Sequence, residues 1–127
     1  MRFIVQDAQG DQVTLQIPHT NYRNTFRLAA SGVALQPGAA LRGTILATAR
    51  KVEAVSDGGN YVEPLFGRPR RMQGEIIAAD AAKNELSVEV GYPVTVRLPD
   101  TQKVAEFAVG GRVGWDNAEL PTFEMRR

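Results

Sequence analysis

The fold is decided by a stretch near the N-terminus that recurs in the second half of the chain. Residues 3–17 read FIVQDAQGDQVTLQI, and residues 76–90 read IIAADAAKNELSVEV. Set side by side without gaps, large apolar residues coincide at five positions, among them Phe3 with Ile76 and Leu15 with Val88. Internal similarity of this kind indicates a repeated structural unit. We therefore expect two copies of one small fold.

Two further matches follow in the same order along the chain. Residues 22–28 read YRNTFRL and residues 92–98 read YPVTVRL, which share the frame Y-x-x-T-x-R-L. Residues 37–41 read PGAAL and residues 109–113 read VGGRV, each with a glycine that breaks a strand before another apolar run. Three matches in the same order indicate a duplication that covers most of the chain.

The periodicity within each copy is that of β-strands. Residues 12–17, 85–90 and 94–98 alternate polar and apolar side chains, which buries one face of a strand and is typical of antiparallel sheet. Residues 8–11 and 81–84 are expected to be tight hairpin turns. The segments 29–35 and 99–107, between the third strand and the glycine, leave room for one helical turn.

We therefore predict an all-β protein made of two tandem small β-barrels, each similar to an OB or SH3 barrel. The first unit spans residues 1–55 and the second spans residues 72–127. Between them, residues 56–71 read SDGGNYVEPLFGRPRR and are expected to be a linker rich in Gly, Pro and Arg. The alternative is one fused barrel with pseudo-twofold symmetry, in which the two repeats interleave their strands. Trp115 is expected in the core.

Part of each copy resembles the TOBE and Mop domains, which are small OB-like barrels that often occur in pairs. Residues 35–48, LQPGAALRGTILAT, are similar to the closing half of such a domain, and residues 109–116 with 119–123 are similar to its ending. The resemblance implies tandem barrels. The Mop branch binds molybdate-like oxyanions through a Ser-Ala-Arg-Asn signature, but residues 69–74 read PRRMQG at that place. Oxyanion specificity is therefore not implied by the resemblance.

Several classes of function lack the residues that they need. The chain has no cysteine and a single histidine, His19, in a loop without a neighbouring carboxylate, so we expect no metal site. No phosphate-binding glycine loop and no nucleophile motif occurs, so we expect no enzyme activity and no cofactor. No apolar run is long enough to cross a bilayer, and the N-terminus lacks a secretory apolar region. We expect a cytoplasmic protein.

Charge is distributed unevenly along a chain whose net charge is +1. Residues 1–71 hold nine Lys and Arg against five Asp and Glu, whereas residues 72–127 hold six against nine. An electropositive first half attracts anions. In addition, the alternation turns Arg27 outward beside Tyr22, and an exposed aromatic ring near an arginine can stack a base and neutralise its phosphate. The candidate binding residues are Tyr22, Arg23, Arg27, Arg42, Arg68, Arg70, Arg71, Tyr92 and Arg97.

The leading expectation is a non-catalytic module that binds a polyanion, either RNA or single-stranded DNA, through the basic first unit and the linker. One alternative is a protein-interaction or self-association module, because the halves carry opposite net charges. Another is capture of a small oxyanion, as in TOBE-like domains. For the candidate residues, a structural interpretation also stands: the tyrosines cap the barrel ends, and the arginines pair with nearby carboxylates or are solvated.

Overall fold

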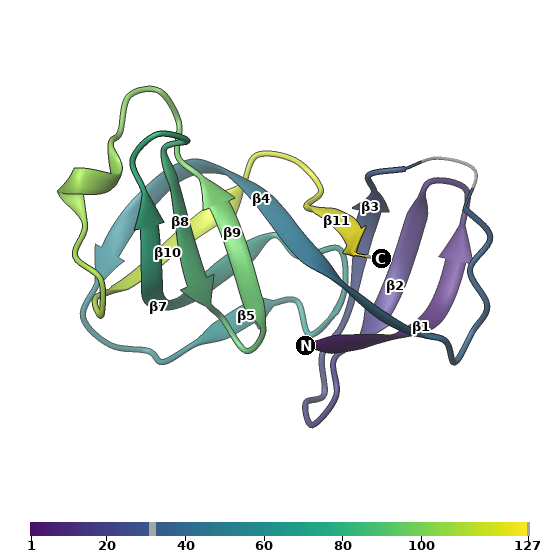
Figure 1. Ribbon diagram of the computed structural model, residues 1–127. Coiled ribbons are helices and arrows are strands. Elements are labelled where there is room, and N and C mark those ends of the chain that lie inside the picture. Colours follow the sequence, from purple (N-terminus) through teal and green to yellow (C-terminus); the bar gives the residue numbers. More distant parts are fainter. Residues whose placement is uncertain (31–32, 127) are drawn as a thin grey trace.

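The computed structural model describes residues 1–30 and 33–126, and the chain is all-β, as the alternating patterns predict (Figure 1). The strands are β1 (Arg2–Gln9), β2 (Gln12–Gln16), β3 (Arg23–Leu28), β4 (Ala40–Val55), β5 (Tyr61–Glu63), β6 (Phe66–Gly67), β7 (Arg71–Asp80), β8 (Glu85–Glu89), β9 (Pro93–Arg97), β10 (Arg112–Asn117) and β11 (Thr122–Arg126). The 3-10 helix η1 (Val104–Glu106) forms the single turn expected in segment 99–107. In the matching segment 29–35, residues 31 and 32 lie outside the described residues.

All of the strands belong to one mixed sheet, whose main order is β1-β2-β3-β11-β4-β10-β7-β8-β9. The additional pairings of β1 with β4 and of β4 with β9 close the sheet at two places. The result is two closed rings of strands, which we call circuits. The first circuit consists of β1, β2, β3, β11 and the beginning of β4. The second circuit consists of the remainder of β4 with β10, β7, β8 and β9. Closure of this kind leaves few strand edges open to other chains.

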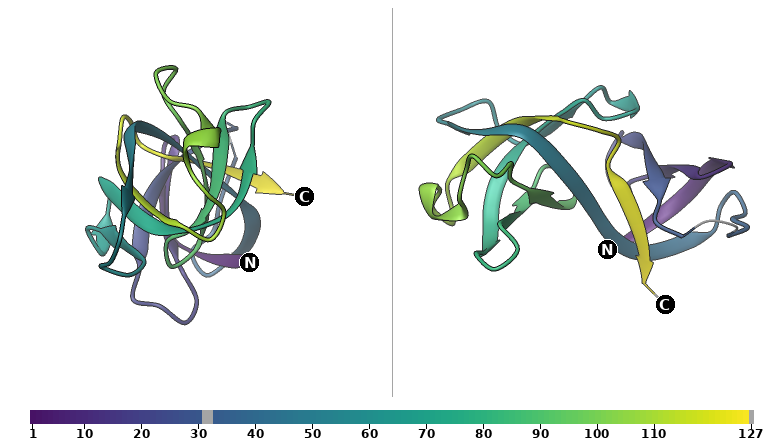
Figure 2. Two further views of the ribbon diagram at one scale, coloured as in Figure 1. Left: turned by 90° about the vertical axis from the view of Figure 1, so that its left-hand side faces the viewer. Right: turned by 90° about the horizontal axis from the view of Figure 1, so that it is seen from above.

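Strand β4 belongs to both circuits. It is 16 residues long, and at about 3.3 Å per residue it extends for roughly 50 Å. Figure 2 shows it running from one circuit to the other. The buried residues Ile45, Ala47 and Ala49 alternate with less buried ones, so one face of the strand points into the core along this passage. The alternation shifts at the exposed pair Arg50 and Lys51, where the register with β10 also shifts.

Each circuit receives its last strand from the other half of the chain. The first circuit is completed by β11, which lies parallel to β3 and antiparallel to β4. The second is completed by the later part of β4, which lies parallel to β9 and antiparallel to β10. The expectation that residues 1–55 and 72–127 each close alone is therefore corrected: the strands interleave. The physical reason is that no turn residue interrupts β4 after Gly43, so the chain continues into the second circuit.

Residues 56–71, expected to be a linker, are part of the sheet. They contain β5, which pairs antiparallel with β7, and β6, which pairs in parallel with β3. Val62 in the middle of β5 is buried. The glycines and prolines of this segment therefore shape the turns between short strands rather than a free connection.

The two circuits repeat the same backbone hydrogen bonds. Val5 and Ile76 each donate their amide, at 2.8 Å, to the carbonyl of the residue that follows the turn glycine. Val5 is thus the counterpart of Ile76, whereas the ungapped alignment paired Ile76 with Phe3. That alignment holds for β2 and β8 but is two residues out for β1 and β7. The loop at 81–84 is longer than the turn at 10–11 by those two residues.

A single apolar core runs through both circuits. Trp115 is fully buried on β10, as expected. At the junction, the rings of Phe3 and Phe123 meet edge to face with centroids 5.5 Å apart, and the ring of Tyr92 packs edge to face against Phe3 and Phe26. Such edge-to-face pairs stabilise a core beyond the area they bury. The contact between the circuits is therefore aromatic.

Candidate anion-binding groove

The two tyrosines expected to stack on a ligand lie instead at the junction of the circuits. Tyr92 is completely buried, and its hydroxyl donates a hydrogen bond of 2.8 Å to Oδ1 of Asn24. Burial raises the pKa of Tyr92 well above its ordinary value. Tyr22 is half-buried, lies edge-on to Tyr92, and accepts a hydrogen bond from the amide of Val62. The expectation of an outward-facing ring is thus corrected for Tyr92.

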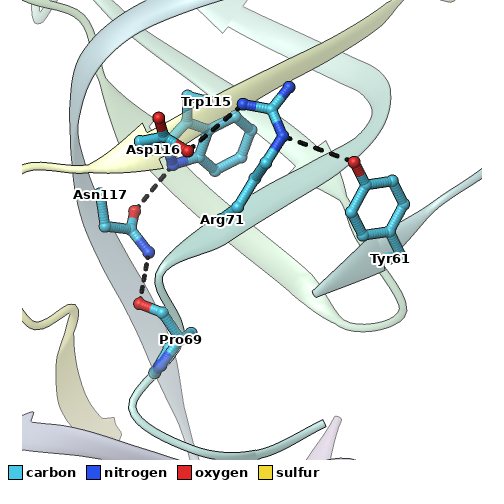
Figure 3. A network of polar contacts seen from close by, with 6 residues as sticks. All are labelled: Tyr61, Pro69, Arg71, Trp115, Asp116 and Asn117. Atoms are coloured by element: carbon cyan, nitrogen blue, oxygen red, sulfur yellow. Dashed lines mark hydrogen bonds and ion pairs between the residues drawn. The ribbon is translucent and has the colours of Figure 1, made fainter. Parts of the chain in front are cut away.

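Two of the candidate arginines form ion pairs with carboxylates within the fold. Arg97 forms an ion pair of 3.0 Å with Glu85. Arg71 donates from Nε to the hydroxyl of Tyr61 and from Nη1 to Asp116, both at 3.4 Å (Figure 3). The hydrogen bond with Tyr61 raises the pKa of Arg71, and Asp116 adds to this while burial opposes it. The structural interpretation given above for these arginines fits both positions.

Arg71 belongs to a polar network on β10 and the segment before β7 (Figure 3). Nε1 of Trp115 donates to Oδ1 of Asn117 at 2.8 Å, and Nδ2 of Asn117 donates to the carbonyl of Pro69 at 3.0 Å. This network fastens the end of the segment 56–71 to the second circuit. The hydrogen bonds of Arg71 to Tyr61 on β5 and Asp116 on β10 connect these strands in the same region.

The remaining candidate arginines are exposed but do not gather around Arg42. Arg23 and Arg27 lie on β3, and the guanidinium of Arg23 lies over the ring of Phe66. Arg68 and Arg70 flank the buried Pro69 between β6 and β7. None of these four arginines lines the groove at Arg42. The candidate arginines therefore do not come together in one groove.

Arg42 instead lies at the centre of a row of three arginines on adjacent strands. In the antiparallel register, Arg42 on β4 is opposite Arg2 on β1 on one side and opposite Arg126 on β11 on the other. Residues directly opposite one another in antiparallel strands project from the same face of the sheet. All three are exposed. We call this set the arginine row.

The arginine row forms one wall of a groove of about 440 Å³. The second circuit also lines the groove, with Ser87 of β8 and Pro93 and Thr95 of β9. Thr44 of β4 adds a third hydroxyl. The groove lies where β4 passes between the circuits, close to both ends of the chain (Figure 1). The described residues that line the groove include three arginines and no carboxylate, so this part of its lining is basic.

The charges of the arginine row are not neutralised by the described residues. The two ion pairs that these residues form lie elsewhere. The acidic side chain closest in register is Glu124, which is opposite Thr44 and two residues from Arg126, and it does not line the groove. Like charges directly opposite one another destabilise a sheet. A bound anion would relieve that repulsion, and guanidinium groups bind phosphate or carboxylate oxygens through paired N–H donors.

Sequence reasoning identified Arg42 but missed Arg2 and Arg126. The alternation turns Arg2 outward together with Ile4, and it turns Arg126 outward together with Glu124. Nothing in that local pattern brings the two arginines to Arg42. They meet only because β11 returns to complete the first circuit.

The fold and the groove define an all-β chain with a basic cleft between two closed circuits. No family model matches the chain, and the comparisons with curated proteins and with solved structures gave no significant match. Within residues 1–30 and 33–126, no three His, Asp or Glu side chains are placed to hold a metal ion. No helix in this part of the chain is long and apolar enough to cross a membrane.

Proposed function

We propose that this protein is a binding module without catalytic activity, and that it binds single-stranded RNA or DNA in the groove beside the arginine row. The observation that carries the proposal is the register of Arg2, Arg42 and Arg126 on three adjacent strands. Planar guanidinium groups suit phosphate oxygens better than ammonium groups do. The hydroxyls of Thr44 and Thr95 supply further hydrogen-bond donors in the same groove.

The spacing of the arginine row favours a chain of anions over a single small one. Neighbouring strands lie about 4.8 Å apart, so the backbones that carry the outer two arginines are separated by roughly 10 Å. A small oxyanion in contact with one end of the row would leave the other end without a partner. A phosphodiester backbone laid across the strands offers phosphates to all three guanidinium groups.

We further infer that the two circuits are duplicated small barrels of the OB or SH3 kind with exchanged closing strands. The recurring hydrogen bonds support this inference, as do the parallel pairs β3–β11 and β9–β4 at matching places. The turn glycines Gly38 and Gly110 also match, with φ angles of 89° and 91°. Small barrels of this class use their outer strand faces and loops to bind oligonucleotides. We also propose that these two barrels are related to the TOBE and Mop domains.

Titration with a fluorescent oligonucleotide tests the proposed function. With about three phosphate contacts, log K should fall with a slope of about −2 against log salt, roughly twentyfold between about 50 and about 200 mM. Arg42→Gln should weaken binding about tenfold, because it removes a charged hydrogen-bond donor. The control is Arg50→Gln, which removes the same charge from the exposed side of β4 outside the groove. No binding at low salt, no salt slope, or equal effects of the two substitutions would contradict the proposal.

The alternatives from the sequence give different results in the same experiments. Self-association of the basic and acidic halves produces an oligomer that dissociates as salt rises, which light scattering on the free protein detects. Capture of a small oxyanion raises the melting temperature in the presence of phosphate or molybdate alone. Nucleic-acid binding by a protein that stays monomeric at all salt concentrations favours the proposed function over both.

A further inference from the structure

A second hollow, on the outer face of the first circuit, carries an exposed aromatic ring. It measures about 280 Å³ and is lined by Gln6, Thr14, Arg23, Thr25, Phe66 and Gly67. Phe66 on β6 is 58% exposed. Cζ of Arg23 lies over this ring, 5.8 Å from its centroid. The ring therefore contributes little to the core and is open to a ligand.

The backbone around Phe66 is held in place by hydrogen bonds. β6 pairs with β3 in the register that sets Phe66 beside Arg23. The buried side chain of Asn24 donates from Nδ2 to the carbonyls of Pro64 and Gly67, both at 3.2 Å. Gly67 has a φ of 91°, and a Cβ at this residue would meet nothing within 4 Å, so space remains open next to the ring. An exposed ring on a fixed backbone is preorganised for stacking.

The polar groups of the hollow can hydrogen-bond without adding negative charge. Thr14 and Thr25 share a hydrogen bond of 2.8 Å between their hydroxyls. Gln6 lies at the β-bulge of β1 and is exposed. Its carboxamide offers both a donor and an acceptor, the combination that reads the edge of an unpaired base. Among the described residues that line the hollow there is no carboxylate that would repel a nucleotide.

We propose that this hollow is a stacking subsite for one unpaired base, a proposal that rests on the proposed function. The base stacks on Phe66 and the guanidinium plane of Arg23, and its edge meets Gln6. At about 280 Å³ the hollow is smaller than the roughly 300–1,000 Å³ of pockets that enclose a whole ligand, so it suits one ring system. Because a base within a duplex is already stacked and paired, the subsite makes the protein selective for single strands.

Phe66→Leu tests the subsite, because it keeps an apolar side chain and removes the π-face. The probes are a single-stranded oligonucleotide carrying one 2-aminopurine, whose emission falls when it stacks, and inorganic polyphosphate, which has no bases. We expect Phe66→Leu to weaken oligonucleotide binding about tenfold, within the range measured for base–aromatic stacking. The quenching of 2-aminopurine should disappear, and the affinity for polyphosphate should stay unchanged. Leu65→Ala, at a neighbouring exposed apolar residue, is the control and should leave all three readouts as in the wild type.

The outcomes separate the two proposals. If Phe66→Leu binds and quenches the oligonucleotide as the wild type does, the stacking subsite is overturned while the arginine row is unaffected. If the wild type binds neither oligonucleotide nor polyphosphate, the proposed function fails and the subsite fails with it. The melting temperatures of both variants should equal that of the wild type, because the substituted side chains are exposed. In that case, any loss of binding is local and does not come from unfolding.

Discussion

The arginine row has a counterpart in the second circuit with the same register and different side chains. By the backbone pairings, Arg2, Arg42 and Arg126 correspond to Gln73, Gly114 and Glu53. There, Gly114 on β10 is opposite Gln73 on β7 and opposite Glu53 on β4. Three cations in one half are thus matched by an amide, a glycine and an anion in the other.

Two of the three counterpart positions, Gln73 and Gly114, are buried and Glu53 is exposed, whereas all three residues of the arginine row are exposed. Nε2 of Gln73 donates to the carbonyls of Asp57 and Gly59, both at 3.0 Å, so the loop before β5 lies over it. The guanidinium of Arg71 fills the space at Gly114, where a Cβ would lie 2.7 Å from Nη2. The comparison teaches that the shared backbone register does not by itself create a binding site. The side chains and the loop over Gln73 distinguish the proposed site from its counterpart.

The largest expected effect comes from breaking the first circuit at its borrowed strand. Phe123→Ala removes a fully buried ring from β11, and it should lower the free energy of unfolding by about 3–5 kcal/mol, measured by urea denaturation. Oligonucleotide binding by the variant should weaken at urea concentrations where the wild type is still folded. The reason is that β11, which carries Arg126, detaches more easily in the variant. The exposed neighbour Glu124→Ala is the control. A loss below about 1 kcal/mol would show that β11 is not needed to close the circuit.

The comparison is tested most directly by giving the arginine row the chemistry of its counterpart. The triple variant Arg2→Gln, Arg42→Ala and Arg126→Glu should weaken oligonucleotide binding about a hundredfold, or about 2.7 kcal/mol. The reverse change, Glu53→Arg in the second circuit, should add little, because the neighbouring positions Gln73 and Gly114 are buried, so a new guanidinium at the exposed residue 53 would act alone. Anisotropy titrations at constant salt measure both. An affinity gained in Glu53→Arg equal to that lost in the triple variant would show that net charge alone governs binding.

The two tyrosines at the junction provide a third test. Tyr92→Phe leaves Oδ1 of the buried Asn24 without its donor and should cost about 2 kcal/mol of unfolding free energy. Tyr22→Phe removes an acceptor that is only half-buried, so water replaces it and the cost should be about 0.5 kcal/mol. Thermal and urea unfolding measure both values. Equal losses would contradict the different burial of the two hydroxyls.

Tyr92 also predicts a pH dependence. Burial raises its pKa in the folded protein, so above the ordinary tyrosine pKa of about 10 the unfolded chain loses a proton that the folded chain keeps. The free energy of unfolding should therefore fall as the pH rises above about 10, and this fall should be smaller in Tyr92→Phe. Unfolding curves of wild type and variant across that range check the sign.

The smallest effect is expected at Glu89, whose counterpart in the first circuit is Gln16. Burial raises the pKa of Glu89, and Glu75 is opposite it in the sheet. A raised pKa means that this group favours folding when protonated, and that the advantage is lost as the pH rises past about 4. Glu89→Gln should therefore raise the melting temperature slightly at neutral pH and leave it unchanged at about pH 3. A lower melting temperature at neutral pH would contradict this assignment.

The local features of the fold follow from the sequence because they depend on neighbours in the chain. Period-two alternation located β2, β8 and β9, and the glycines at 38 and 110 adopt positive φ angles at the breaks. Trp115 was expected in the core from its place in an alternating strand and is buried there. In each case, a few consecutive residues carry the information.

The exchange of strands and the arginine row depend instead on contacts far apart in the chain. Alternation shows which face of β11 is buried, but it does not show which strand β11 joins. It also did not show that Tyr92, which precedes β9, is buried and finds its partner Asn24 in the other half of the chain. Arg2 and Arg126 became neighbours of Arg42 for the same reason. The arginine row, on which the proposed site rests, could therefore be recognised only after the pairings were known.

The exchange of closing strands between the halves also determines how the molecule would respond to cleavage of the backbone. Residues 56–60 are exposed, and a protease nick there would yield one fragment that ends with β4 and another that ends with β11. Each fragment would keep the strand that completes the other, so the pieces would stay interlocked without a peptide bond between them. Separating them requires both closed sheets to open together, which makes the two halves a single cooperative unit.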